Sequence, residues 1–123
     1  MKAAVNSESA PSPIGPYSQG IDAGAVYCSG QIGLDPSTGK LVEGIVGQTG
    51  RTLSNLDAVL RAAGLGLNDV VRTTVYMVDL GEFSQMNDEY GKHFSPPFPA
   101  RSTVQVAALP KGAKVEIDAV AVR

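Results

Sequence analysis

The sequence contains one cysteine, one histidine, no cluster of basic residues and no long apolar run. Cys28 has no partner for an intrachain disulfide, so a disulfide-stapled fold is excluded and a reducing compartment is expected. One cysteine and one histidine cannot supply the ligands of a structural zinc site, and we expect no metal. No stretch approaches the ~20 apolar residues that cross a bilayer, and residues 1–13 lack the apolar core of a signal peptide. We therefore expect a cytoplasmic protein without a membrane partner.

The net charge and the chain length limit the classes of partner and the number of domains that the protein can have. Ten Lys and Arg stand against twelve Asp and Glu, which gives a net charge of -2. Nucleic acids are bound through clustered cations, so we expect no nucleic-acid partner. The 123 residues suffice for one domain, residues 1–123, with a single core. Fourteen glycines and eight prolines without a repeat period predict tight turns between many short elements.

Two segments have the apolar spacing of an amphipathic helix. We predict a helix over residues 46–63, ended by Gly64 in a left-handed cap, and a second over residues 81–94, stopped by the prolines that follow. The predicted buried faces consist of Leu53, Leu56, Val59, Leu60 and Ala63 in the first helix and Phe83, Met86, Tyr90 and Phe94 in the second.

Four other segments have the composition or alternation of strands. They are residues 24–34, 70–80, 101–109 and 113–122. The order strand, helix, strand, helix, strand, strand predicts an α+β sandwich, a mixed sheet with both helices on one face. We expect the last two strands, joined by a turn at residues 110–112, to be neighbours in the sheet.

Alternation along the last two strands predicts what the two faces of the sheet carry. If their apolar positions face the helices, the far face holds Arg101, Thr103, Gln105, Glu116 and Asp118. The apolar residues expected on that same face are Tyr76, Val78, Val120 and Val122. A face in water should be more polar, so we expect another subunit to cover it.

The stretch SPIGPYSQG, residues 12–20, packs two prolines and two glycines around one tyrosine. Each proline fixes its own φ and biases the preceding residue toward extended geometry. The segment is therefore stiff and presents Tyr17, as the wall of a site would require. A plain N-terminal turn is the alternative interpretation.

Three motifs in order, together with one strand, resemble the Rid family of imine and enamine deaminases, also called the YjgF type. The matching segments are IGPYSQG (14–20), SGQIGLDPSTGKL (29–41), VRTTVYMVDL (71–80) and FPARSTVQVAALPKGAKVEIDAVAV (98–122). The resemblance implies a chorismate-mutase-like sandwich, a homotrimer around a central barrel, and sites for small molecules between subunits. It further implies hydrolysis of 2-imino acids, derived from 2-aminoacrylate-type enamines, to 2-keto acids and ammonia. No cofactor is required, because protonated imines react with water.

The same resemblance assigns roles to individual residues. Arg101 matches the arginine that binds the substrate carboxylate, and Glu116 matches the acid that positions or activates water; we take these two as the catalytic pair. The other substrate-binding positions carried over are Tyr17, Ser29, Gly30, Asn87 and Thr103. Thr103 stands where some relatives carry a cysteine, and the chain is short between Phe94 and Phe98.

The chemistry suits these residue types, although simpler interpretations exist for each. A guanidinium offers a planar fork of donors that matches a carboxylate. Glu116 stands between Val115 and Ile117, where partial burial would raise the pKa of its carboxyl and a neighbouring arginine would lower it. A carboxyl whose pKa is tuned in this way is suited to proton transfer. Alternatively, Arg101 and Glu116 form only an ion pair and Tyr17 only packs; His93 and Cys28 are expected to be structural.

Two other functions compete with the deaminase. The first is a non-enzymatic trimer that binds small carboxylates or acts as a holdase. The second, a ribonuclease or translation inhibitor, has been attached to relatives of the family, and the acidic charge balance argues against it.

Overall fold

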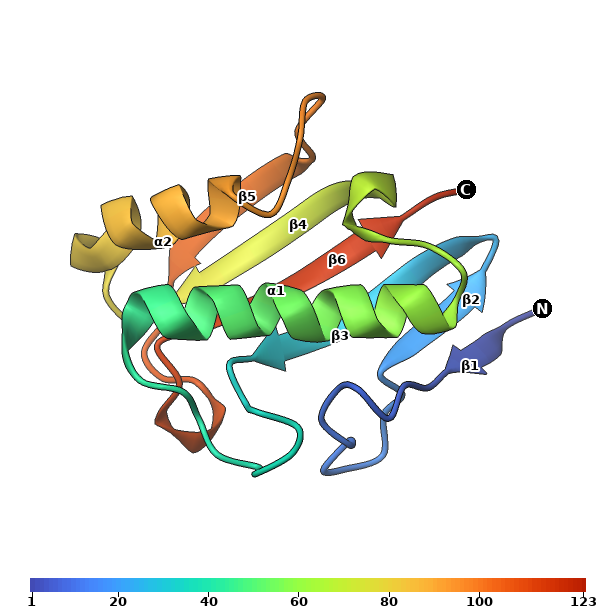
Figure 1. Ribbon diagram of the computed structural model, residues 1–123, viewed down its shortest axis with the longest axis horizontal. Coiled ribbons are helices and arrows are strands. Elements are labelled where there is room, and N and C mark those ends of the chain that lie inside the picture. Colours follow the sequence, from blue (N-terminus) through green and yellow to red (C-terminus); the bar gives the residue numbers. More distant parts are fainter.

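Both helices lie on the same face of one mixed six-stranded sheet in the computed structural model, which describes residues 1–123 (Figure 1). The strands are β1 (Ala3–Val5), β2 (Gly20–Ala23), β3 (Ala25–Ile32), β4 (Val70–Met77), β5 (Ala100–Gln105) and β6 (Val115–Ala121). The helices are α1 (Gly44–Ala62) and α2 (Phe83–Gly91). None of the helices has the length and apolarity that crossing a bilayer requires. The predicted α+β architecture with two helices on one face is confirmed.

The helices form where the apolar periodicity predicts them. Leu53, Leu56, Val59 and Leu60 of α1 are fully buried, and Met86 and Tyr90 of α2 are buried as well. Gly64 has a φ of 78°, the left-handed conformation that ends α1 and that glycine adopts without steric cost. Since the apolar face of each helix packs on the sheet, one core lies between the two layers.

The expected pairing of the last two strands is wrong. β6 lies in the middle of the sheet, between β3 and β4, and β5 pairs with β4 in parallel at one edge (Figure 1). The connection that contains residues 106–114 therefore crosses over β4, whereas a hairpin would have placed β5 and β6 side by side.

This pairing corrects the predicted faces. Arg101 lies opposite Thr73 of β4, and Thr103 lies opposite Val75. Thr73 and Val75 are fully buried beneath the helices. Glu116 lies opposite Tyr76, on the face that points away from the helices. Directly opposed residues share a face, so Arg101, Thr103 and Gln105 lie on the helix side and Glu116 and Asp118 on the other.

Two strands were not predicted. β1 and β2 contain three and four residues and extend the sheet beyond β3, antiparallel to one another. Runs this short carry too little alternation to be recognised. Gly20 opens β2 where a Cβ atom would lie 3.0 Å from Cγ1 of Val59, so glycine lets the strand approach α1 closely.

The open face, defined as the sheet surface turned away from both helices, is partly apolar. It carries Tyr27, Tyr76, Val104 and Val120 on adjacent strands, of which Tyr27 is 53% and Val104 41% exposed. Simple alternation along β4 would place Val71 on the same face as Val75, but the pairing of β4 with β6 shifts register between Val70 and Arg72. That bulge buries Val70 and exposes Val71.

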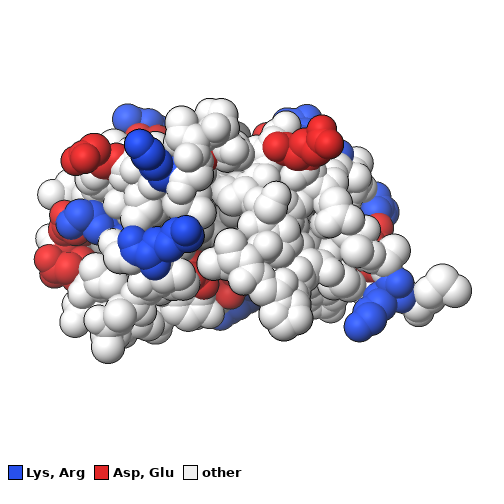
Figure 2. Space-filling view, turned by 90° about the horizontal axis from the view of Figure 1, so that it is seen from below, with Lys and Arg blue, Asp and Glu red and all other residues white.

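Charge of neither sign dominates the lower side of the molecule. Figure 2 shows basic and acidic side chains scattered around a wide uncharged area there. Several charged groups are already paired, as in the contacts of Lys92 with Glu89 and Arg123 with Asp22. Such a surface lacks the continuous positive tract that phosphate backbones require.

Candidate functional site

Five of the seven predicted site residues line two separate hollows on one chain. We call the first the acid half-site; it is lined by Tyr17, Gly30 and Glu116 together with Pro11, Ser12, Ile14, Gln31, Ile32, Leu34, Pro110 and Lys111. We call the second the arginine half-site; it is lined by Asn87, Tyr90, Gly91, Phe98, Pro99 and Arg101. Because Glu116 and Arg101 project from opposite faces of the sheet, one chain does not bring them together.

Gly30 creates the room in which the Glu116 carboxyl lies. A Cβ atom at position 30 would lie 2.2 Å from Oε2 of Glu116, a distance that real atoms do not tolerate. The pairing of β3 with β6 also shifts register between Cys28 and Gln31, so the strand is irregular at this point. The carboxyl is thus seated against the backbone of β3.

Glu116 has no ionic partner in the chain. None of the five ion pairs involves Glu116 or Arg101, so the two do not form the simple ion pair considered from the sequence. Burial raises the pKa of the Glu116 carboxyl, and the negative charge of Asp118 adds to the rise. A half-buried carboxyl with a raised pKa accepts a proton more readily than an exposed one.

The Tyr17 hydroxyl is oriented by its own segment. It accepts a hydrogen bond from the backbone N–H of Ile14 at 3.3 Å, and the backbone N–H of Tyr17 donates to the Gly15 carbonyl at 2.8 Å. Since a phenol has one proton to donate, accepting from Ile14 leaves that proton available to a ligand.

Ser29 supports the acid half-site indirectly, through hydrogen bonds to the segment that carries Tyr17. Its hydroxyl donates to the Ser18 carbonyl at 2.6 Å, and its backbone N–H donates to the Gln19 carbonyl at 2.9 Å. Ser29 is not among the residues that line the hollow. Its contacts tie the segment that carries Tyr17 to β3.

Arg101 is held by aromatic rings in the arginine half-site. The guanidinium carbon lies 4.7 Å from the ring centre of Tyr90 and 5.6 Å from that of Phe83, both on α2. The Tyr90 hydroxyl is bonded to Oγ1 of Thr73 at 2.7 Å, which fixes the ring. Stacking orients the planar cation and leaves its N–H groups without a carboxylate partner.

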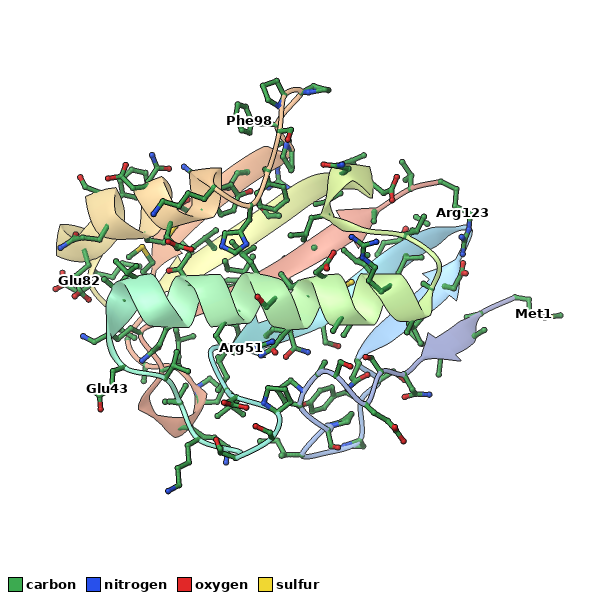
Figure 3. All side chains as sticks on the ribbon, in the orientation of Figure 1. Met1, Glu43, Arg51, Glu82, Phe98 and Arg123 are labelled. Atoms are coloured by element: carbon green, nitrogen blue, oxygen red, sulfur yellow. The ribbon has the colours of Figure 1, made fainter.

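Phe98 and Lys111 were not singled out from the sequence. Phe98 projects from the loop between α2 and β5 (Figure 3), is 58% exposed and lines the arginine half-site. Lys111 lines the acid half-site in a left-handed conformation, with a φ of 58°. The sequence signals were present, since Phe98 adjoins the PARS motif and Lys111 precedes Gly112 in a turn. Thr103 lies on the strand of Arg101 but lines neither half-site.

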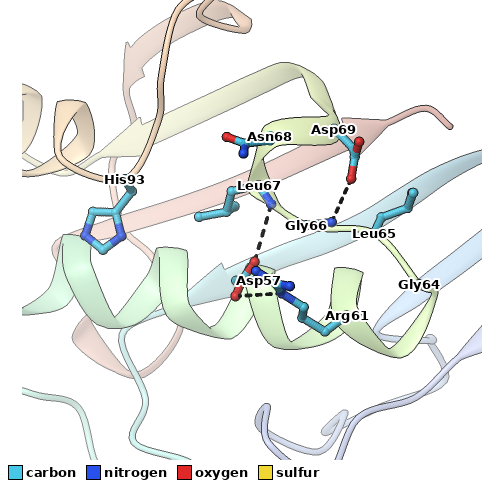
Figure 4. A pocket seen from close by; sticks show the side chains of 9 residues that line it. All are labelled: Asp57, Arg61, Gly64, Leu65, Gly66, Leu67, Asn68, Asp69 and His93. Atoms are coloured by element: carbon cyan, nitrogen blue, oxygen red, sulfur yellow. Dashed lines mark hydrogen bonds and ion pairs between the residues drawn. The ribbon is translucent and has the colours of Figure 1, made fainter.

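The largest hollow, of about 600 Å³, lies elsewhere (Figure 4). Its charged groups serve the fold: Asp57 pairs with Arg61 at 3.4 Å and accepts from the Leu67 N–H. His93 borders it and contacts Glu89 at 2.8 Å. Cys28 is buried in the core, where desolvation raises the pKa of its thiol to about 12, so it is unreactive as a thiolate.

Comparison with known proteins decides the family. The family model described as "Endoribonuclease L-PSP", which covers the YjgF and Rid proteins, matches residues 7–123. The chain belongs to the Rid family.

The chain is similar to proteins of the Rid family over nearly the whole length of both sequences. "Protein DfrA" of Myxococcus xanthus is 53% identical over 97% of this chain and 94% of its own. The "2-iminobutanoate/2-iminopropanoate deaminase" of Salmonella typhimurium is 46% identical over 100% and 99%. A crystal structure described as Escherichia coli TdcF with bound serine superposes with a TM-score of 0.93 at 41% identity, covering 98% of both chains. The Rid fold and a Rid-type enzyme are therefore supported.

Proposed function

We propose that this Rid protein hydrolyses 2-imino acids to 2-keto acids and ammonia. The observation that carries the proposal is the pair of unpartnered ionic groups: a guanidinium stacked on aromatic rings and a half-buried carboxyl seated against Gly30. The names of the imine deaminases that are 46% identical support the same reaction. The serine named in the TdcF structure is a small molecule with a carboxylate, the group that Arg101 would bind.

The reaction needs both half-sites, and we propose that they meet across subunit contacts of a cyclic homotrimer. The segment that carries Tyr17 and the turn before β6 lie at the lower edge of Figure 1, whereas the loop between α2 and β5 lies at the upper edge. A rotation about one axis places the acid half-site of one subunit against the arginine half-site of the next. The open faces of three sheets would then form the central barrel.

The chemistry follows from this arrangement. Arg101 holds the substrate carboxylate, which places the adjacent C=N carbon beside Glu116 of the neighbouring subunit. Glu116 takes a proton from water as the water oxygen bonds to that carbon, and it passes this proton to the imine nitrogen, which gives the neutral carbinolamine. Glu116 then takes the hydroxyl proton and passes it to the nitrogen as the C–N bond breaks, so one imine and one water give one keto acid and one ammonia. Tyr17 donates a hydrogen bond in the same hollow.

The direct test supplies 2-aminoacrylate from a serine dehydratase and measures the rate at which keto acid appears. We expect the rate to rise in proportion to added protein. An unchanged rate combined with measurable pyruvate binding would support the non-enzymatic binder instead. Cleavage of RNA without any acceleration of keto acid release would support the ribonuclease.

Gly30→Ala tests the seat of the carboxyl. The added Cβ must displace the Glu116 side chain, so we expect kcat/KM to fall by about 10-fold or more. Gly47→Ala on α1 is the matched control, because its Cβ meets only Cγ2 of Val42 at an ordinary 3.5 Å. Steady-state kinetics and thermal unfolding of both variants provide the measurement. Full activity in Gly30→Ala would show that Glu116 need not occupy this position.

Val120→Asp tests the assembly. Val120 lies between Tyr27 and Arg72 on the open face. Burying a carboxylate there on association removes its hydration, a cost that a salt bridge with Arg72 does not fully repay, so the variant should oppose association. We expect light scattering at micromolar concentration to report a trimer for the wild type and smaller, inactive species for the variant. Val46→Asp, at an exposed position of α1, should leave both the mass and the activity unchanged. A fully active monomeric wild type would exclude the trimer.

A further inference from the structure

The side chain of Gln19 organises the segment in front of the acid half-site. It is 3% exposed and makes four hydrogen bonds to backbone groups of residues 7–11. Its oxygen accepts from the Ser7 N–H at 2.6 Å, and its nitrogen donates to the carbonyls of Ser7, Ala10 and Pro11 at 3.1, 3.4 and 2.8 Å. One amide thus fixes three points of an irregular backbone that belongs to no strand or helix.

We call residues 7–18 the strap. Its ends are anchored where Val5 of β1 pairs with Gly20 of β2 and where Ser18 accepts the Ser29 hydroxyl. Between Pro11 and Ser18 its hydrogen bonds are internal, from Ile14 to Tyr17 and from Tyr17 to Gly15. The position of this middle part relative to β6 therefore depends on its anchors.

The middle of the strap forms one wall of the acid half-site. Pro11, Ser12, Ile14 and Tyr17 line that hollow together with Glu116. Pro11 is also the residue whose carbonyl receives the shortest of the bonds from the Gln19 nitrogen. A change at Gln19 is consequently transmitted to the wall, although Gln19 itself does not line the hollow.

We propose that Gln19 is a positioning residue of the acid half-site, which sets the distance and angle at which the strap holds Tyr17 over Glu116. The kinetic part of this inference rests on the proposed imine hydrolysis; the structural part does not. Only an amide supplies both the acceptor for Ser7 and two N–H donors, which the three carbonyls share. A carboxylate of the same shape would direct negative charge at those carbonyls, and a thioether would leave them unpaired.

Two variants and one control test the inference. Gln19→Met keeps the length of the side chain without its hydrogen bonds, and Gln19→Glu keeps the shape without the donors. Leu60→Ala, at a fully buried position of α1 outside the strap, lowers stability and keeps all the hydrogen bonds of Gln19. The readouts are amide hydrogen exchange of residues 12–18, affinity for pyruvate, and kcat and KM for imine hydrolysis.

In Gln19→Met we expect the strap amides to exchange faster and pyruvate affinity and kcat/KM to fall by about 10-fold. Leu60→Ala, compared at equal fraction folded, should retain wild-type exchange of the strap and wild-type kinetics. In Gln19→Glu the loss of pyruvate affinity and of kcat/KM relative to wild type should shrink as pH falls, because a protonated carboxyl again donates one hydrogen bond.

Unchanged exchange of the strap in Gln19→Met would overturn the inference. Faster exchange with unchanged pyruvate affinity would also overturn it, since the strap would then not act on the site. If the wild type proves inactive on imines, the proposed function fails. Exchange and pyruvate affinity still decide the role of Gln19 in that case.

Discussion

Arg101→Lys is expected to lower kcat/KM for imine hydrolysis by about 100-fold, although the positive charge is kept. The guanidinium lies 4.7 Å from the Tyr90 ring centre, and that stacking fixes the plane in which its N–H groups point. Lysine supplies a point charge on a flexible stem, so it neither stacks as a plane nor grips a carboxylate with two parallel bonds. Arg101→Ala should lose at least as much activity.

Two controls separate this effect from loss of folding. Arg61→Lys alters an exposed arginine on α1 that pairs with Asp57, and it should leave kinetics unchanged. Thermal unfolding should show that Arg101→Lys remains folded and light scattering that it remains assembled. An Arg101→Ala variant with most of its activity would exclude a role for Arg101 in holding the carboxylate.

Glu116→Gln is expected to reduce kcat by roughly 10²–10⁴-fold while pyruvate affinity changes little, because glutamine keeps the shape but takes up no proton. In the wild type, kcat/KM should fall as pH drops through the pKa of Glu116. Burial raises that pKa, so the fall should occur at higher pH than for an exposed glutamate. The acidic fall in the pH profile should be absent from the variant.

Asp118→Asn provides a second measurement on the same group. The charge of Asp118 contributes to the raised pKa of Glu116, so its removal should move the acidic fall to lower pH. The substitution also replaces the carboxylate that the Tyr76 hydroxyl contacts at 3.1 Å with an amide, whose oxygen can accept the same hydrogen bond.

One outcome of the Glu116→Gln measurement would contradict the proton-transfer role. If that variant lost pyruvate affinity as completely as turnover, Glu116 would be a structural residue.

The helices and the alternation of β6 followed from the sequence because their signals are local. Leu53, Leu56 and Leu60 repeat with the period of a helix, and Gly64 marks its end within one turn. Val115 and Ile117 alternate with Glu116 along a single strand, so burial of one set exposes the other wherever the strand lies. The family motifs were equally local, which is why the candidate residues could be named before the fold was known.

Partner choice between strands was decided only by the tertiary structure. Alternation places Arg101 and Thr103 on one face of their own strand, but which face of the sheet that becomes depends on pairing with β4, far away in sequence. The bulge that exposes Val71 likewise arises from the contact of β4 with β6. Glu116 and Arg101 therefore lie on opposite faces for a reason that no single segment contains: strand register is set by the packing of the whole sheet against its helices.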